Sequence, residues 1–412
     1  MTTLNPNIPN PPVGQLDQSA KFDDLPAELV EVILQNVQDM DTLSNILRAS
    51  PMALRVFHNY PTSILGSVLK PGRGSEIEDM MGIVAAIRLG KITSSSLNDF
   101  CNDYLNRIGK AGSRHLSHML DTMNMNDKDR CLWIPETAYK VRWHTNGCLK
   151  YYMDRFMALR LEEPCDLFFQ YEDHETPPWR RRVASSGIQR YRSGPPSARE
   201  ELVVLGAFWR TQIEYELQNA FIAGTLDWPD DKDDLFPFDV EDIWGVPNDF
   251  EFMSVMYAVS EYVKAVKDAD YPTIADDDDQ TPRRLPAAKR SWPFTYPAAD
   301  DLPEGLECDA AADQKHPHPG VQFWNLLRWH QCTPLHGVSF CEFHEWGFAL
   351  WDLQRFCASK LLSPDEEVWD SNKKSRARDR LFYTWRKIVA PKERREIDNI
   401  SNVSVPWPPV GR

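Results

Sequence analysis

Apolar residues recur at helical spacing close to the start of the chain. The recurring aliphatic positions are Leu25, Leu29, Val30, Ile33, Leu34 and Val37. Spacings of three and four residues predict a short helix with a wide apolar face. Pro26 suits the first turn of this helix, where a missing N–H leaves no bond unmade, and Glu28 suits the positive end of the helix dipole.

Two further short helices are predicted directly after the first. The second helix begins near residue 41 and carries the apolar residues Leu43, Ile46 and Leu47. Ser50 followed by Pro51 is typical of an N-cap and a first-turn proline, so a third helix is expected to begin there and to carry Leu54 and Phe57. Three compact helices therefore fit into fewer than 40 residues.

Helical spacing continues through much of the remaining chain. The amphipathic segments are residues 64–69, 77–89, 97–108, 148–161, 202–221 and 250–267. Ser197 and Glu200 have the spacing of a capping box, which predicts that the fifth of these helices begins at this point. Residues 115–143 show no clear pattern.

Residues 343–357 predict one further helix that is buried on most faces. Its apolar stripe consists of Phe343, Trp346, Leu350, Leu353 and Cys357, with Phe348 and Trp351 on a second side. Ser363, Pro364 and Glu366 predict another helix start, and apolar residues recur again over residues 381–388.

These patterns predict a mainly α protein with an N-terminal three-helix unit followed by an irregular helical domain with long loops. The expected parts are a disordered arm (1–20), the three-helix unit (21–60), a helical body (61–267), a flexible acidic and Pro-rich insertion (268–320), the C-terminal part of the body (321–390) and a tail (391–412). Residues 268–320 are expected to be flexible because they carry many prolines and little apolar surface to bury.

The composition narrows the class of protein. The chain has 412 residues, 42% of them hydrophobic and 26% charged, which is typical of a folded globular protein. No apolar run approaches the ~18 residues that a membrane helix needs, and the first residues lack the basic and apolar regions of a signal peptide. The eight scattered cysteines then predict reduced thiols and an intracellular protein of the cytoplasm or nucleus.

The net charge of −15 is concentrated in one part of the chain. Residues 227–280 contain 17 acidic and three basic residues, whereas residues 176–199 hold six arginines and residues 371–396 hold ten basic and three acidic residues. An acidic balance argues against a dedicated nucleic-acid binder. The acidic insertion is instead hypothesised to fold back onto the basic segments as an internal mask, while a solvated basic face is the alternative reading of those segments.

Residues 25–57 resemble an F-box. The match consists of the opening Leu-Pro-x-Glu-Leu, the Ile-Leu that follows it, and a second helix after Asp41-Thr42-Leu43. The Ala-Ser-Pro at residues 49–51 and the C-terminal segment FHEWGFALWDLQRF are similar to fungal F-box-like proteins. The chain departs from the common pattern because it lacks the Arg/Lys-x-Trp ending, and Phe57 takes the aromatic position.

The resemblance implies a protein-interaction module without catalysis or cofactor. Such a unit docks on the adaptor subunit of a cullin–RING ubiquitin ligase, and the rest of the chain would present an unidentified protein cargo. The positions that the resemblance places at the adaptor contact are Leu25, Pro26, Leu29 and Ile33. A helix that is apolar on two sides is consistent with this role, because one side can pack internally while the other meets a partner.

Other functions rest on weaker patterns. Cys332, His336, Cys341 and His344 could close a tetrahedral zinc site, although their spacing matches no common zinc finger and suits a packed turn equally well. The motifs of phosphate, dinucleotide, metalloprotease and serine hydrolase sites are missing, so the sequence predicts no enzyme, and acidic pairs such as Asp233-Asp234 and Glu366-Glu367 are typical of solvated faces. The alternatives left open are an F-box-like scaffold outside the ligase and a zinc-supported nucleic-acid-associated protein.

Overall fold

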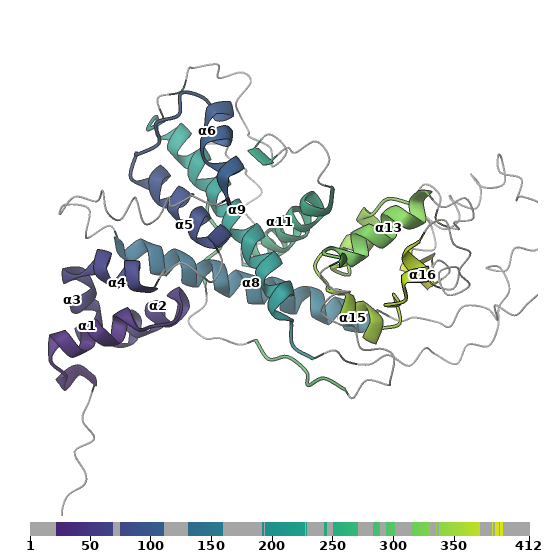
Figure 1. The fold of residues 1–412 in the computed structure, drawn as a ribbon, viewed down its shortest axis with the longest axis horizontal. Coiled ribbons are helices and arrows are strands. Elements are labelled where there is room, and N and C mark those ends of the chain that lie inside the picture. Colours follow the sequence, from purple (N-terminus) through teal and green to yellow (C-terminus); the bar gives the residue numbers. More distant parts are fainter. Residues whose placement is uncertain are drawn as a thin grey trace, which may run out of the picture. The chain divides into compact units, whose positions relative to one another are not determined.

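The computed structural model shows a mainly helical protein (Figure 1). It describes residues 22–68, 75–110, 131–159, 192, 194–226, 228, 243–244, 250–270, 283–288, 294–300, 315–329, 335, 338–370, 381, 384–386 and 388–389. Within these residues there is no β-strand beyond an isolated bridge at Ala299. None of the helices in this part combines the length and the apolar character that a membrane crossing requires. The expected mainly α fold with long connecting segments is therefore confirmed.

The chain divides into two compact units. Unit 1 comprises Met1–Gly74 and Ser117–Tyr139, and unit 2 comprises Ser75–Leu116 and Lys140–Arg412. Helix α8 (Trp133–Ala158) contributes its first turns to unit 1 and the remainder to unit 2. Unit 1 thus extends beyond the range 21–60 that the sequence suggested, and a helix begins inside the segment 115–143 that showed no pattern.

Unit 1 contains short helices joined by tight turns. They are η1 (Phe22–Asp24), α1 (Ala27–Gln35), α2 (Met40–Ala49), α3 (Pro51–Asn59) and α4 (Pro61–Val68). The Asp39 carboxylate caps α2 by accepting the Thr42 N–H at 2.7 Å. The Ser50 hydroxyl caps α3 by accepting the Ala53 N–H at 3.1 Å, with Pro51 in the first turn. Local capping therefore fixes where these helices begin.

A small apolar core holds the helices of unit 1 together. Helix α1 packs against α3 and α4, and α2 packs against α3. The fully buried core side chains are Val30, Leu34, Leu43, Ala53, Phe57, Ile64 and Leu65. The Arg48 guanidinium of α2 lies over the ring of Tyr139 of α8, 4.5 Å from its centroid. The first turns of α8 thus complete this unit.

Unit 2 is built around long packed helices. Its elements are α5 (Ser75–Arg88), α6 (Leu97–Asp103), η2 (Leu105–Arg107), the later turns of α8, α9 (Ala198–Ile222), α11 (Phe250–Asp270), α13 (Pro319–Trp329), α14 (Cys341–His344), α15 (Leu353–Ala358) and α16 (Glu366–Trp369). Helix α9 packs against both α5 and α11, and α11 packs against α13. The predicted capping box is present at the start of α9, since Ser197 and Glu200 each accept the other's backbone N–H.

The prediction of one continuous helix over residues 343–357 is wrong. Helix α14 ends at His344, a series of turns follows, and α15 begins only at Leu353 with Asp352 as its N-cap. The helix breaks because Gly347 adopts a φ of +70°, and because the Asp352 carboxylate accepts the Arg355 N–H at 2.9 Å. The expectation of burial does hold, since Phe343, Phe348 and Phe356 surround the buried Trp385.

Replacing Gly347 by Ala should destabilise unit 2. A Cβ at this position would lie 2.8 Å from the Cβ of Tyr152 and 3.1 Å from the Trp351 ring, in addition to the strain of a positive φ. We expect the free energy of unfolding to fall by about 2–4 kcal/mol in urea titrations. Gly224 is the matched control because it has a φ of +65° with no atom within 4 Å of a built Cβ. Gly224→Ala should cost only the backbone strain of about 1 kcal/mol, so an equal loss in both variants would contradict this account.

Two parts of the predicted insertion 268–320 are packed against helices rather than isolated in solvent. The Leu285 side chain is buried, and Asn219 of α9 forms hydrogen bonds with the backbone of Arg283. Asp300 pairs with Arg192, so one acid of the insertion does meet one arginine of the basic segment 176–199. The acidic run 276–279 and most of residues 176–199 lie outside the described residues.

Candidate interaction surface

Helix α1 presents an apolar face that its own unit leaves uncovered. Leu29, Val32 and Ile33 are 51%, 53% and 39% exposed, whereas Val30 and Leu34 of the same helix are fully buried. The helix has only nine residues, and its buried side is already packed on α3 and α4. Helix α1 therefore has two apolar sides with different environments.

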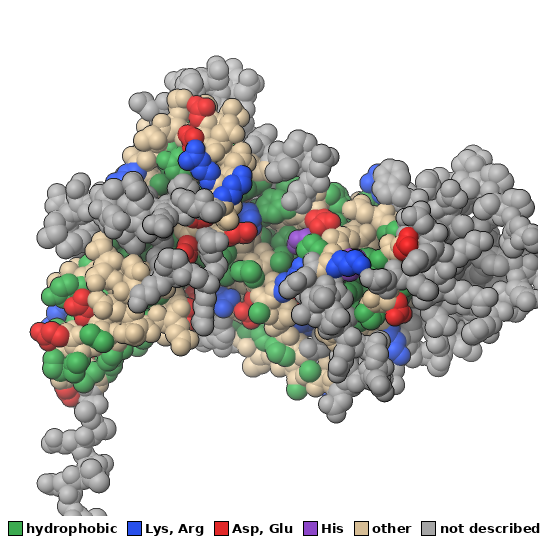
Figure 2. Space-filling view, viewed as in Figure 1, with side chains coloured by type: hydrophobic (Ala, Val, Ile, Leu, Met, Phe, Trp, Pro, Cys, Tyr) green, Lys and Arg blue, Asp and Glu red, His purple; other side chains and the backbone are tan. Residues whose placement is uncertain are grey.

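Helical geometry places the exposed residues on one continuous surface. With about 100° of rotation per residue, Val32, Leu29 and Ile33 fall within an arc of about 100°, and the buried pair falls on the adjacent arc. Leu29 and Ile33 are four residues apart, so their side chains are neighbours along the helix. We call Leu29, Val32 and Ile33 the α1 face. Figure 2 shows hydrophobic side chains at the surface over this helix with acidic side chains beside them.

The structure places the four predicted contact residues on or beside the α1 face. Leu29 and Ile33 belong to it, Pro26 is exposed at the start of the helix, and Leu25 is half-buried. The sequence reasoning missed Val32. Its spacing of three residues from Leu29 was a signal for it, but the prediction followed only the four-residue spacing of the motif.

The Cys/His cluster is described only in part. Cys332 and His336 lie outside the described residues. Cys341 is exposed at the start of α14, whereas His344 is buried beside the Phe340 ring, with 4.9 Å between ring centroids. Among the residues that the structure describes, no three His, Cys, Asp or Glu side chains group as a metal site would need. The described pair therefore lends the zinc hypothesis no support.

The remaining charged segments give no site within the described part of the chain. Residues 180–182, 233–234 and 373–380 lie outside it, and the side chains of residues 366–367 are likewise outside the description. Arg192 and Arg199 are the described arginines of the first basic segment, and the Arg192 backbone N–H donates to the Asp300 carboxylate at 2.8 Å.

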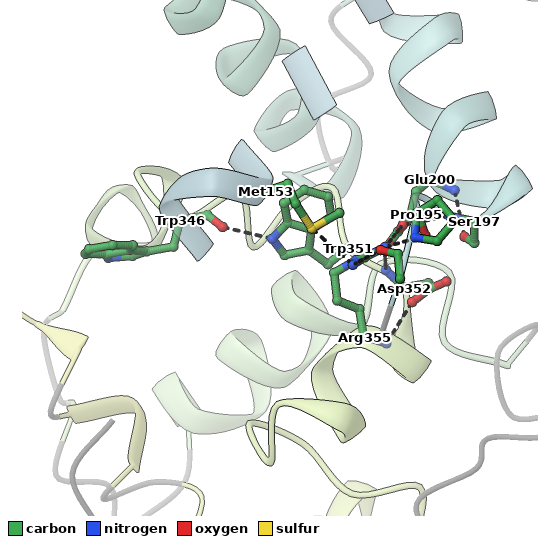
Figure 3. A network of polar contacts seen from close by, with 9 residues as sticks. Met153, Pro195, Ser197, Glu200, Trp346, Trp351, Asp352 and Arg355 are labelled. Carbon is green, nitrogen blue, oxygen red and sulfur yellow. Dashed lines mark hydrogen bonds and ion pairs between the residues drawn. The ribbon is translucent and has the colours of Figure 1, made fainter. Parts of the chain in front are cut away.

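A buried ion pair lies at the centre of a polar network in unit 2 (Figure 3). Arg355 donates from Nε and Nη2 to the two carboxylate oxygens of Glu200, both at 2.7 Å. Glu200 also accepts the backbone N–H of Ser197 at 2.9 Å and of Asp352 at 3.1 Å. Burial raises the pKa of Glu200 to about 7, although Arg355 acts to lower it. Because solvent does not reach either side chain, the pair joins chain segments rather than binding a ligand.

Unit 2 also contains two buried histidines, His144 and His344. Burial lowers the pKa of both His144 and His344 to about 4. Within the described residues, no group forms a hydrogen bond with Nδ1 of His144 or Nε2 of His344. Both side chains are therefore neutral at pH 7, and neither is exposed to a substrate.

Comparisons with protein-family models, with curated proteins and with solved structures found no match for this chain. Among the described residues, the α1 face groups three exposed aliphatic side chains on one short helix.

Proposed function

We propose that unit 1 is an F-box-type module that docks on the adaptor subunit of a cullin–RING ubiquitin ligase. In this proposal the rest of the chain presents a protein cargo, and the chemistry of ubiquitin transfer belongs to the partners. The observation that carries the proposal is the α1 face, because it lies on the helix that begins with the Leu-Pro-x-Glu-Leu motif of residues 25–29.

The physical basis is the burial of apolar surface. Fully burying an aliphatic side chain of this size is worth about 1.5–3 kcal/mol. Leu29, Val32 and Ile33 already lie on one arc of a folded helix, so binding does not have to order them first. An amphipathic helix that presents such an arc fits the groove or the helix face of a partner. Exposed Glu28 lies at its edge, and polar groups are typical of an interface rim.

Charge substitution on the α1 face should abolish adaptor binding. We expect the double variant Leu29→Asp/Ile33→Asp to bind purified adaptor at least about 100-fold more weakly than the wild-type chain, because two carboxylates would be buried in the contact. Pull-down followed by titration calorimetry measures this. Both substituted side chains are exposed, so the far-UV circular dichroism and the unfolding midpoint should remain those of the wild type.

Leu202 provides the matched control. It is a helical leucine of α9 with 53% exposure, close to that of Val32, and it lies in unit 2. Leu202→Asp should leave adaptor binding unchanged. A wild-type chain that does not bind the adaptor overturns the proposal, and unit 1 would then be an interaction scaffold outside the ligase.

A further inference from the structure

An extended part of the chain lies along the helices of unit 2. We call residues 283–288 and 294–300 the strap; both stretches are irregular in backbone and described in the structure. At one end, Arg283 is bonded to Asn219 near the C-terminus of α9. At the other end, Asp300 is paired with Arg192, six residues before α9 begins. The two ends of the strap therefore lie near the two ends of α9.

Side chains of the helices hold the backbone of the strap. The Asn219 amide donates to the Arg283 carbonyl at 2.9 Å and accepts the Arg283 N–H at 2.9 Å. The His144 Nε2 lies 2.8 Å from the Pro286 carbonyl oxygen, so this nitrogen must be the donor. Paired bonds from one amide side chain to one residue's N–H and C=O do not depend on that residue's side chain. Such bonds are how proteins bind extended peptides of differing sequence.

The described side chains that anchor the strap include Leu285, Phe294 and Tyr296. Leu285 is 2% exposed and fills an apolar site. Phe294 packs against Trp143 with 5.4 Å between ring centroids, and the Tyr296 hydroxyl donates to the Asn146 carbonyl at 3.1 Å. Arg284 and Ala287, on either side of the Leu285-Pro286 pair, are exposed. One buried leucine followed by a proline is thus the main side-chain feature that the helices recognise in residues 283–288.

The charge around Arg284 is unfavourable to the strap. Burial lowers the pKa of Lys140 in α8, and the nearby charges of Arg88 and Arg284 lower it further, while Glu216 acts in the opposite direction. Arg284 therefore lies close enough to Lys140 for their positive charges to repel, while Arg88 is already paired with Glu216. A peptide with a neutral or acidic residue at this position would interact better with the same surface.

We propose that α8 and α9 form a peptide-binding groove that the strap occupies in cis, and that its ligand is an extended peptide with a Leu-Pro pair preceded by an acidic residue. The strap is then an internal pseudo-ligand, which an incoming peptide displaces. The groove lies within unit 2 and does not depend on adaptor docking by unit 1.

Displacement is physically reasonable because the described bonds between the strap and its surroundings are separate ones, to Asn219, His144, Asn146 and Arg192. A segment with little buried side-chain area opens at a lower free energy than the core helices around it. The strap also lowers the apparent affinity of any competitor. This apparent affinity equals the intrinsic affinity multiplied by the fraction of chains in which the groove is vacant.

A variant whose strap sequence is replaced, which we call the vacated chain, tests the proposal directly. In the full-length protein, residues 283–288 and 294–300 are replaced by Gly and Ser at equal length, and a fluorescent peptide with the sequence of residues 281–300 is titrated in anisotropy measurements. We expect the peptide to bind the vacated chain at least about 30-fold more tightly than the wild-type chain. A peptide carrying Arg284→Glu should bind about 5-fold more tightly than the native peptide, and one carrying Leu285→Asp should not bind.

Asn219, which bonds both backbone groups of Arg283, gives the decisive variant. Asn219→Ala in the vacated chain should weaken the peptide about 10-fold, because both backbone bonds to residue 283 are lost. Leu202→Ala, on the same helix, should leave the affinity unchanged. A vacated chain with wild-type circular dichroism that binds no peptide overturns the proposal and makes the strap a permanent part of the core.

Hydrogen exchange in the intact protein keeps the proposal testable if the vacated chain does not fold. The Arg283 N–H is bonded to the Asn219 side chain, so its exchange reports opening of the strap. We expect it to exchange at least about 100-fold faster than the core amides of α9, through a local opening. Exchange of this amide only on global unfolding would overturn the proposal.

Discussion

Replacing Arg355 by Met should lower the free energy of unfolding of unit 2 by about 3–5 kcal/mol. Glu200 is fully buried, and Arg355 is the cation that its two carboxylate oxygens contact. Without the guanidinium, the carboxylate either keeps an uncompensated charge in the interior or takes up a proton. Equilibrium unfolding in urea, followed by far-UV circular dichroism, measures the loss.

The cost should exceed that of losing a single contact because Arg355 joins several segments. Its Nη1 donates to the Met153 sulfur of α8 at 3.2 Å, and its Nη2 donates to the Pro195 carbonyl at 3.1 Å (Figure 3). The guanidinium also lies over the Trp351 ring, 5.0 Å from its centroid. One side chain therefore connects α15 to α8, to α9 and to the residues that precede α9.

Matched variants separate the charge from the packing. Lys150 and Asp154 form an exposed pair at 2.5 Å one turn apart on α8, and Lys150→Met should cost no more than about 0.5 kcal/mol. Arg355→Lys keeps the positive charge but cannot form the bidentate hydrogen bonds. Its loss of stability should therefore lie between those of Arg355→Met and Lys150→Met. The double variant Glu200→Gln/Arg355→Met should be more stable than Arg355→Met alone, since it leaves no buried charge. If Arg355→Met and Lys150→Met cost the same, this account of the ion pair is wrong.

Glu200 shows which kind of interaction the sequence predicts and which kind it does not. Its spacing from Ser197 predicted the capping box, and the structure confirms it. The second role of the same carboxylate depends on Arg355, which is 155 residues away. Periodicity and capping rules describe interactions within one or two turns, so they contain no information on such a pairing. The short helices of unit 1 were predictable because their starts are fixed locally by Asp39 and Ser50.

The C-terminal segment shows the opposite outcome. The apolar stripe of residues 343–357 has the period of a helix, but the backbone turns at Gly347 and restarts at Asp352. Apolar residues at helical spacing indicate which side chains are buried. A chain that turns sharply inside an aromatic cluster buries the same side chains without forming one continuous helix. The glycine and the N-cap aspartate were the local signals, and the periodic pattern outweighed them.

The strap was missed because its composition is that of a linker. Residues 283–300 contain prolines and basic residues around one leucine, Leu285, which is buried in the structure; such a sequence predicts a flexible segment. The bonds that hold Arg283 and Pro286 involve their backbone groups, and these are the same in every sequence. The α1 face differs in this respect, because its aliphatic side chains and the motif are both visible in the sequence.

Acidification should destabilise unit 2 through its two buried histidines. The pKa of His144 and of His344 is about 4 in the folded chain, against an ordinary value of 6.5 that applies to the unfolded chain. Between pH 6.5 and pH 4 the unfolded state therefore binds more protons. The stability from neutral histidine is complete above pH 6.5 and is lost as the pH falls toward 4, by about 3 kcal/mol for each residue. Urea titrations at intervals across this range measure the slope.

The histidine contribution is best isolated by differences between variants. The raised pKa of Glu200, about 7, has the opposite effect, because the folded state binds a proton more readily there between pH 7 and 4.5. This effect is common to the wild type and to His144→Gln and His344→Gln, so it cancels in the comparison.

The glutamine amide at residue 144 can still donate to the Pro286 carbonyl, as Nε2 does now. Each variant should be less stable than the wild type at pH 7, and this deficit should shrink or reverse by pH 4. Parallel stability curves for the three proteins would show that these histidines titrate alike in both states, and His144 would then be solvated rather than enclosed by the rings of Phe208 and Tyr262.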